Sequence, residues 1–326
     1  MAKTIPSQQT VCAVTVAYND PDELNRLLES ISAQTRPVDC VIVVDNSDES
    51  LLSDRNSVVT DSALCEISNF EFVKSPVNRG SAGGFKMGMA LAYARNYDWI
   101  WLLDQDGIAA KDCLKKLLES SGKAGILCPK VLSIGDESAE LYFRGRLNFL
   151  GGSFPVFSCP GKELSITLFA THGVMISRAA ISETGYYDDR NFFCGWEDHD
   201  YSQRLKKNGI KMLLVSDAVV YHPDLIAKYK KTKAGRFHWT SLLYMFVNSH
   251  LPLPAFLGVV TKTDMSTELG VIRKKTLVAL TKKHIRGFKF WAAFIFSFFC
   301  LVVMKVSGKP VLFVDSLKMY ADMTRD

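Results

Sequence analysis

The 326-residue chain lacks several short motifs that mark common kinds of site. Its eight cysteines form no C-x-x-C pair, which disfavours a zinc knuckle or a dithiol redox centre and favours reduced thiols in a cytosol. No Walker-type loop and no G-x-G-x-x-G stretch follows the first apolar strand, so a P-loop or a nicotinamide site is disfavoured. The N-terminus has no apolar core of the kind that a signal peptide needs, and we expect a cytoplasmic protein.

The charge is unevenly distributed along the chain. Residues 226–326 carry 17 Lys and Arg against 5 Asp and Glu, a balance of +12, whereas the first 225 residues carry −7. An acidic body followed by a basic tail indicates a protein that meets an anionic surface, either a phospholipid leaflet or nucleic acid. Apolar residues make up 48% and charged residues 22%, which argues against disorder.

Strand-like and helix-like patterns alternate in the first half of the chain. The predicted strands span 11–18, a run ending at Asp45, 70–76 and 98–104, and the predicted helices span 23–34 and 81–96. Such alternation predicts an α/β fold with a doubly wound, mostly parallel sheet. Ligands of these sheets bind at the carboxyl ends of strands, where Asp45 and the pair Asp104 and Asp106 fall. Residues 125–195 read as short strands with turns, and 210–222 as a pair of strands ending at His222.

The tail has a different pattern, with two basic amphipathic helices around a proline-broken connector. The run Phe290–Met304 contains 15 residues without a charge, fewer than the ~20 needed to span a bilayer. This run fits either a buried core helix or a helix lying in the membrane interface. The basic residues on both sides of it make the interfacial helix as good an interpretation as the core helix. We therefore predict two regions, a catalytic body over 1–225 and a helical, membrane-associating region over 226–326.

Asp104-Gln105-Asp106 places two carboxylates at the end of a hydrophobic strand. Two acids on alternate positions cannot easily both lie in a dry core. A divalent ion such as Mg²⁺ or Mn²⁺ would be held by such oxygens together with phosphate oxygens. A D-x-D by itself also fits a solvated turn, and its position after three strand–helix units favours the metal.

At this point six stretches together resemble a known family. They are VTVAYNDPDELNRLLESISAQT, VIVVDNSDES, NRGSAGGFKMGMALA, DWIWLLDQDG, FFCGWEDHDYSQRLKKNG and AVVYHP, which cover about residues 10–225. The family is glycosyltransferase family 2, inverting enzymes with the Rossmann-like, nucleotide-sugar-binding fold called GT-A. The glycine-rich stretch, and WEDHDY followed by a strand and YH, most resemble galactofuranosyltransferases. LLDQDG also resembles the DQD of rhamnosyltransferases, so the donor sugar stays open.

The resemblance implies roles for the strand-end residues. Those expected to bind the nucleotide-sugar are Thr15, Ala17, Tyr18, Asp45, Asn78, Arg79, Gly83, Gly84, Asp104 and Gln105. Asp104, Asp106 and His222 are expected to hold Mn²⁺ or Mg²⁺. Two alternatives remain: Asp45 begins an Asx-turn instead of binding a nucleoside, or the glycines only start a helix.

The stretch GWEDHDY is where the catalytic base is expected. An inverting transfer needs one base to deprotonate the acceptor hydroxyl, and acids that repel one another gain a raised pKa. By resemblance Asp198 is that base, Glu197 binds acceptor hydroxyls, and Asp200 caps the helix or orients its neighbours. Trp196 is expected to stack on the acceptor sugar, and His172 to lie on the acceptor loop, where relatives often carry aromatic or small residues. A simple acidic helix start, with Trp196 as core packing, is the alternative.

The resemblance therefore implies an inverting, metal-dependent glycosyltransferase with a UDP- or dTDP-sugar donor, most favourably UDP-galactofuranose. The implied acceptor is a glycan on a polyprenyl diphosphate, in cell-surface polysaccharide synthesis of the O-antigen or capsule kind. We expect peripheral attachment at the cytoplasmic face of the inner membrane, on anionic lipid. A non-catalytic nucleotide- or membrane-binding module is the alternative from another class, nucleic-acid binding lacks a motif, and a homo-oligomer is left open.

Overall fold

The computed structural model describes residues 9–51, 69–141, 143–147 and 153–223, and the single positions Ala279, Lys283, His284, Trp291 and Ile295. In chain order the elements are β1 (Val11–Ala17), α1 (Pro21–Ser32), β2 (Cys40–Asp45), β3 (Phe70–Lys74), α3 (Gly80–Ala94), β4 (Trp99–Asp104), β5 (Ile108–Ala109), α4 (Cys113–Leu118), β6 (Ile126–Ser133), β7 (Asp136–Glu140), β8 (Arg144–Leu147), β9 (Ser153–Pro155), β10 (Glu163–Ile166), β11 (Leu168–Phe169), β12 (Val174–Ser177), α5 (Arg178–Thr184), α6 (Glu197–Lys207) and β13 (Met212–His222).

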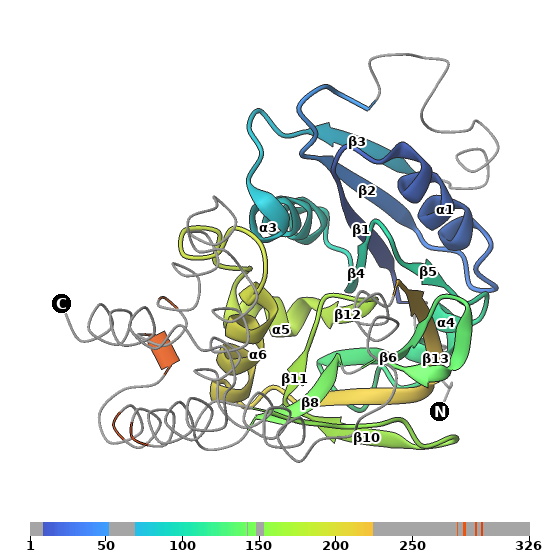
Figure 1. Cartoon of the computed structure of the whole chain (residues 1–326), viewed down its shortest axis with the longest axis vertical. Coiled ribbons are helices and arrows are strands. Elements are labelled where there is room, and N and C mark those ends of the chain that lie inside the picture. The colour runs from blue at the N-terminus through green and yellow to red at the C-terminus, as the bar shows by residue number, and fades with distance from the viewer. Residues whose placement is uncertain are drawn as a thin grey trace, which may run out of the picture.

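One large sheet forms the centre of the body, with strand order β10-β13-β6-β12-β4-β1-β2-β3 (Figure 1). The neighbours β3, β2, β1 and β4 run parallel, as the strand–helix alternation predicted. Strand β12 lies antiparallel between β4 and β6, and β10 lies antiparallel to β13. The sheet as a whole is therefore mixed: β3, β2, β1 and β4 form one parallel part, and β6 and β13 form a second parallel pair.

Helices cover both faces of this sheet, with α1 and α4 on one face and α3, α5 and α6 on the other (Figure 1). Alternate residues of a strand point to opposite faces, so Val11 and Ala13 of β1 pack toward α1, and Cys12 and Val14 pack toward α3. Because both faces are buried, the strands read as continuous apolar runs in the sequence.

The segment expected to form a pair of strands is a single strand, β13. It pairs with β6 along its whole length, with an irregularity in the pairing between Val215 and Val219. The polar residues in this irregularity, Ser216 and Asp217, accept hydrogen bonds from the backbone of the loop before β10. A small second sheet, β11-β8-β9, lies beside β10.

Helix α3 packs very closely on the sheet. A Cβ added to Gly84 would lie 2.6 Å from a methyl carbon of Val16, and one added to Gly88 would lie 2.2 Å from a methyl carbon of Val14. Real Cβ contacts are longer, so only glycine allows the helix to approach β1 at these positions. Gly84 lies in the first turns of α3, and it meets side chains of the core in this structure.

The region predicted to be helical and membrane-associating, 226–326, lies outside the described residues except at its five single positions, which have helical backbone. In the part of the chain that is described, no helix is long and apolar enough to cross a bilayer. Ala279 packs against a cluster formed by Ala82 and Phe192, so this position contacts the body next to α3.

We predict that Gly84→Ala lowers the free energy of unfolding by about 1–3 kcal/mol, because the added methyl overpacks the contact with Val16. Urea unfolding followed by circular dichroism measures the change. Gly122→Ala is the matched control, since an added Cβ there meets nothing within 4 Å. Equal stability of the two variants would show that α3 does not depend on this approach.

Candidate active site

Three parallel-running strands end at one edge of the sheet with polar side chains, Asp45 of β2, Asp104 of β4 and His222 of β13. The short strand β5 pairs with the end of β13, and this pairing returns the loop after β4 toward His222. As a result, His222 Nε2 lies 3.0 Å from a carboxylate oxygen of Asp106. The contact with the Asp106 carboxylate outweighs burial and raises the pKa of His222. Strand topology therefore joins residues that are more than 110 positions apart.

Three side chains at this edge lie close enough to share one cation. Asp104, His172 and His222 each offer a ligand atom, and these atoms lie within 4.8 Å of one another. The Nδ1 atom of His172 is buried beside a carboxylate oxygen of Asp104, yet it makes no hydrogen bond within the described residues. Imidazole and carboxylate ligands together suit a divalent transition-metal ion. The residues present therefore fit the divalent metal implied by the family resemblance.

The residues expected around the nucleoside lie on or after β1. Thr15 and Ala17 are fully buried, and the Oγ1 atom of Thr15 has no hydrogen-bond partner in the described part of the chain. Gln105 accepts from the backbone N–H of Tyr18 (2.6 Å) and donates to its carbonyl (3.3 Å), so the middle residue of D-x-D fixes the loop after β1. The Asp45 carboxylate accepts from the N–H groups of Ser47 and Leu51 and is buried. These contacts are those of the Asx-turn alternative, and nucleoside binding by Asp45 stays a prediction.

The residues expected near the sugar and diphosphate lie at the start of α3. The side chain of Asn78 accepts from the N–H of Gly80 and so shapes the turn into the helix. Arg79 is half-exposed and lies 3.4 Å from a carboxylate oxygen of Asp189. A Cβ on Gly83 would lie 2.3 Å from the Cβ of Arg79, so Gly83 leaves room for that side chain. The glycines serve helix packing here, and their approach to a ligand stays a prediction.

The acid cluster begins α6 after a sharp backbone turn. Gly195 and Trp196 both have positive φ angles, +84° and +72°, and a left-handed tryptophan is a strained residue. Trp196 is half-buried and packs beside Phe192, which agrees with the core-packing alternative. The turn directs Glu197 inward, where it is 5% exposed and its Oε1 accepts from the hydroxyl of Ser81. The other oxygen of Glu197 is buried without a hydrogen bond in the described residues.

Asp198 has the electrostatics of a general base. Burial, together with the neighbouring Glu197 carboxylate, raises the pKa of Asp198 to about 8. Asp104 raises this pKa further, which shows that the acid cluster and the strand-end group act on one another across the site. Burial also raises the pKa of Glu197. A carboxylate that titrates near neutral pH accepts a proton readily from a hydroxyl that becomes a nucleophile.

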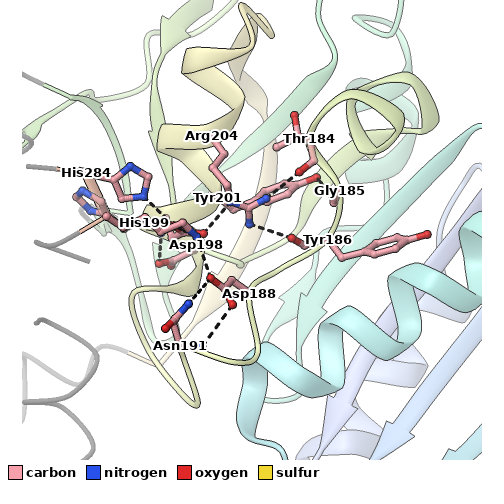
Figure 2. Close-up of polar contacts among 12 residues, drawn as sticks. Thr184, Gly185, Tyr186, Asp188, Asn191, Asp198, His199, Tyr201, Arg204 and His284 are labelled. Atoms are coloured by element: carbon pink, nitrogen blue, oxygen red, sulfur yellow. Dashed lines mark hydrogen bonds and ion pairs between the residues drawn. The ribbon is translucent and has the colours of Figure 1, made fainter. Parts of the chain in front are cut away.

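Asp200 anchors the helix and makes no contact with the strand-end group. Its fully buried carboxylate accepts from Arg204 (2.8 Å), and it lies 2.8 Å from Lys283 and 2.7 Å from His284 of the tail. These contacts outweigh burial and lower the pKa of Asp200. Figure 2 shows Arg204 continuing to the carbonyls of Thr184 and Tyr186, with His284 beside the start of the helix.

Sequence reasoning missed Arg144, which lies in the irregular middle of the chain. Its side chain is 3% exposed, and its guanidinium donates to the carbonyls of Pro129, Phe143, Ala170 and His172 at 2.7–3.1 Å. The stretch LYFRGRL holds two arginines, Arg144 and Arg146, at alternate positions, and the sequence does not distinguish the buried one from an exposed strand residue.

Solved structures show which fold this is. The chain aligns with GalNAc-T7 bound to UDP, GalNAc and Mn²⁺ at a TM-score of 0.54 and 16% identity, over 83% of this chain and 55% of that one. It also aligns with residues 1–349 of S. aureus TarS in complex with UDP, at a TM-score of 0.52 and 14% identity, over 84% of this chain and 82% of that one. The fold is therefore that of the GT-A glycosyltransferases, as expected from the sequence.

Sequence comparison gives the family. The model for glycosyl transferase family 2 matches residues 12–185. Galactofuranosyltransferase GlfT1 of Mycobacterium tuberculosis (strain ATCC 25618 / H37Rv) is 31% identical over 238 residues, which are 71% of this chain and 75% of the relative. GlfT1 of Mycolicibacterium smegmatis is 27% identical over 239 residues, 71% of this chain and 76% of the relative. The chain belongs to glycosyl transferase family 2, and it is a glycosyltransferase.

The pKa of Asp198 leads to a pH prediction. A general base works when ionised, so with Asp198 in that role kcat/KM for the donor should rise with pH up to about 8 and level off above it. Asp198→Asn should lower turnover by about 10²-fold or more and abolish this rise.

Glu197→Gln gives the matched test of the cause. Removing the neighbouring negative charge lowers the pKa of Asp198, so the rise should move to lower pH. A rise that stays in place in Glu197→Gln, or that persists in Asp198→Asn, would assign the titration to a different group.

Proposed function

We propose that this enzyme is an inverting, metal-dependent galactofuranosyltransferase that uses UDP-galactofuranose. The observation that carries the proposal is Asp198, a buried carboxylate whose pKa of about 8 is raised in part by the charge of Asp104, a member of the strand-end group that also contains His222. The relatives named galactofuranosyltransferase support the choice of sugar. A UDP-bound neighbour of the same fold supports the choice of nucleotide.

The chemistry follows from where these side chains lie. Asp198 takes the proton of the acceptor hydroxyl as its oxygen attacks the anomeric carbon, and the nucleoside diphosphate departs from the opposite face. The unpartnered Oε2 of Glu197 is a hydrogen-bond acceptor for a second hydroxyl of the acceptor, which orients the sugar. Asp104 and His222 would hold a divalent ion, which would supply positive charge for the departing diphosphate. Mn²⁺ suits the histidine ligand better than Mg²⁺.

The proposed acceptor is a glycan linked to a polyprenyl diphosphate at the cytoplasmic face of the inner membrane. Two exposed apolar side chains of the tail support this location, Trp291 (55% exposed) and Ile295 (65% exposed). Both have helical backbone, and a spacing of four residues places side chains on one face of a helix. Lysine and arginine residues flank this segment and would attract an anionic leaflet. The enzyme would then act on cell-surface polysaccharide of the O-antigen or capsule kind.

A donor panel tests the activity. The full chain is incubated with Mn²⁺, a synthetic polyprenyl diphosphate-linked glycan, and UDP-galactofuranose, dTDP-rhamnose or UDP-pyranoses. We expect transfer from UDP-galactofuranose with inversion at the anomeric carbon, and loss of turnover in EDTA that added Mn²⁺ restores. Asp198→Asn is the control for transfer by a contaminating enzyme. Preference for dTDP-rhamnose, retention of configuration, or full activity in EDTA would each contradict the proposal.

Vesicle binding tests the location. The double variant Trp291→Ser/Ile295→Ser should bind anionic vesicles about 10-fold or more weakly, because two exposed apolar side chains no longer enter the interface. Ile134→Ser, at an exposed apolar residue of the body, is the matched control and should bind as the unchanged protein does. Flotation assays measure both, and equal binding of all three proteins would remove the tail segment from the proposed membrane contact.

A further inference from the structure

His172 lies beside the strand-end acids in a way that its sequence position did not predict. The ring of His172 lies between those of Phe143 and His222. Its centroid is 4.1 Å from that of Phe143 and 4.2 Å from that of His222. Its Nδ1 atom is buried and lies in ion-pair contact with a carboxylate oxygen of Asp104, although the geometry is not that of a hydrogen bond. A cation between this nitrogen and that oxygen would satisfy both atoms at once.

The ring of His222 is held in place by a hydrogen bond to the backbone. His222 Nδ1 lies 2.9 Å from the carbonyl of Pro223, and only the ring can donate in this pair. The lone pair of the neutral ring is therefore on Nε2, which faces the acids. A carbonyl bonded to the second nitrogen is the usual support of a metal-ligating histidine. Asp106 lies 3.0 Å from the same Nε2 and does not belong to the close group of Asp104, His172 and His222.

The backbone around His172 is held by Arg144. The guanidinium donates to the carbonyl of His172 (2.7 Å) and to that of Ala170 (2.8 Å). Phe143 packs against both imidazole rings, with centroids 4.1 and 5.5 Å away. Ligands that are positioned before binding lose little entropy when the ion arrives, which is the condition for a strong site.

We propose that His172 is a ligand of the divalent metal, together with Asp104 and His222. The inference rests on the proposed function, because it assigns the metal of the same donor site. One carboxylate and two imidazoles make a nitrogen-rich set, whereas Mg²⁺ prefers oxygen. The site therefore selects Mn²⁺ or a later divalent ion over Mg²⁺.

Pulsed electron paramagnetic resonance of bound Mn²⁺ tests this by counting imidazole nitrogens. The full chain is loaded with Mn²⁺ alone and with Mn²⁺ plus UDP, with and without ¹⁵N-histidine. We expect coupling from two imidazoles in the unchanged protein, one in His172→Phe and two in Asp106→Asn. His172→Phe keeps an aromatic ring against Phe143, and a matching thermal unfolding midpoint shows that it folds. Its Mn²⁺ should be displaced by at least about 10-fold less Mg²⁺.

The outcomes separate this inference from the proposed function. One imidazole in the unchanged protein, an unaltered count in His172→Phe, or no bound Mn²⁺ with and without UDP would each overturn the assignment of His172. Donor hydrolysis measured in parallel reports on the function alone. Turnover of UDP-galactofuranose with a single imidazole at the metal would contradict the proposed ligand set and agree with the proposed galactofuranosyltransferase activity. Two imidazoles without turnover of any donor would support the ligand set and contradict the function.

Discussion

The site depends on one buried cation, the guanidinium of Arg144. Every hydrogen bond that it makes among the described residues goes to a backbone carbonyl, so its positive charge is not neutralised by a carboxylate in contact with it. The charge instead acts at longer range on Asp104 and Asp198, both of which raise the pKa of Arg144 against the effect of burial. A buried charge is tolerated only with full hydrogen bonding and with compensating charge nearby. Arg144 thus holds the His172 loop in place and offsets part of the negative charge of the acids.

A second constraint is the backbone geometry on the opposite side of the site. Glu197 and Asp198 face the strand ends because two residues before them, Gly195 and Trp196, adopt left-handed conformations. That arrangement costs free energy at Trp196, and the remainder of α6 holds it through Asp200 and Arg204. Burial at the start of the helix then raises the pKa of Asp198, so its position and its raised pKa have the same origin.

Hydrophobic patterning predicted the strands that form the site, because Asp45, Asp104 and His222 each end an apolar run, and parallel strands end at a common edge. It did not predict which polar residues meet there. Arg144 begins the short strand β8, and His172 lies in the bend between β11 and β12. Both positions depend on long-range packing, and neither carries a local signal. The proximity of Asp106 to His222 depends on the two-residue strand β5, which is too short for a periodic pattern. Gly84 was expected to lie near a ligand, and in the structure it allows α3 to pack against Val16. The sequence alone does not distinguish a glycine required by packing from one required by ligand binding.

The uneven charge of body and tail also reflects contacts within the protein, which a count of charged residues does not reveal. The acidic body and the basic tail suggested that the positive charge of the tail serves an outside surface. In the structure, Lys283 lies 2.8 Å from carboxylate oxygens of both Asp188 and Asp200, and His284 contacts Asp200 as well. Part of that charge is therefore used inside the protein, on Asp188 and on Asp200 in the first turn of α6. Such contacts, partly buried, are screened by salt much less than exposed charges are. Lys283 and His284 are thus joined to α6 by their charges, and the exposed apolar side chains of Trp291 and Ile295 lie only a few residues further along the chain.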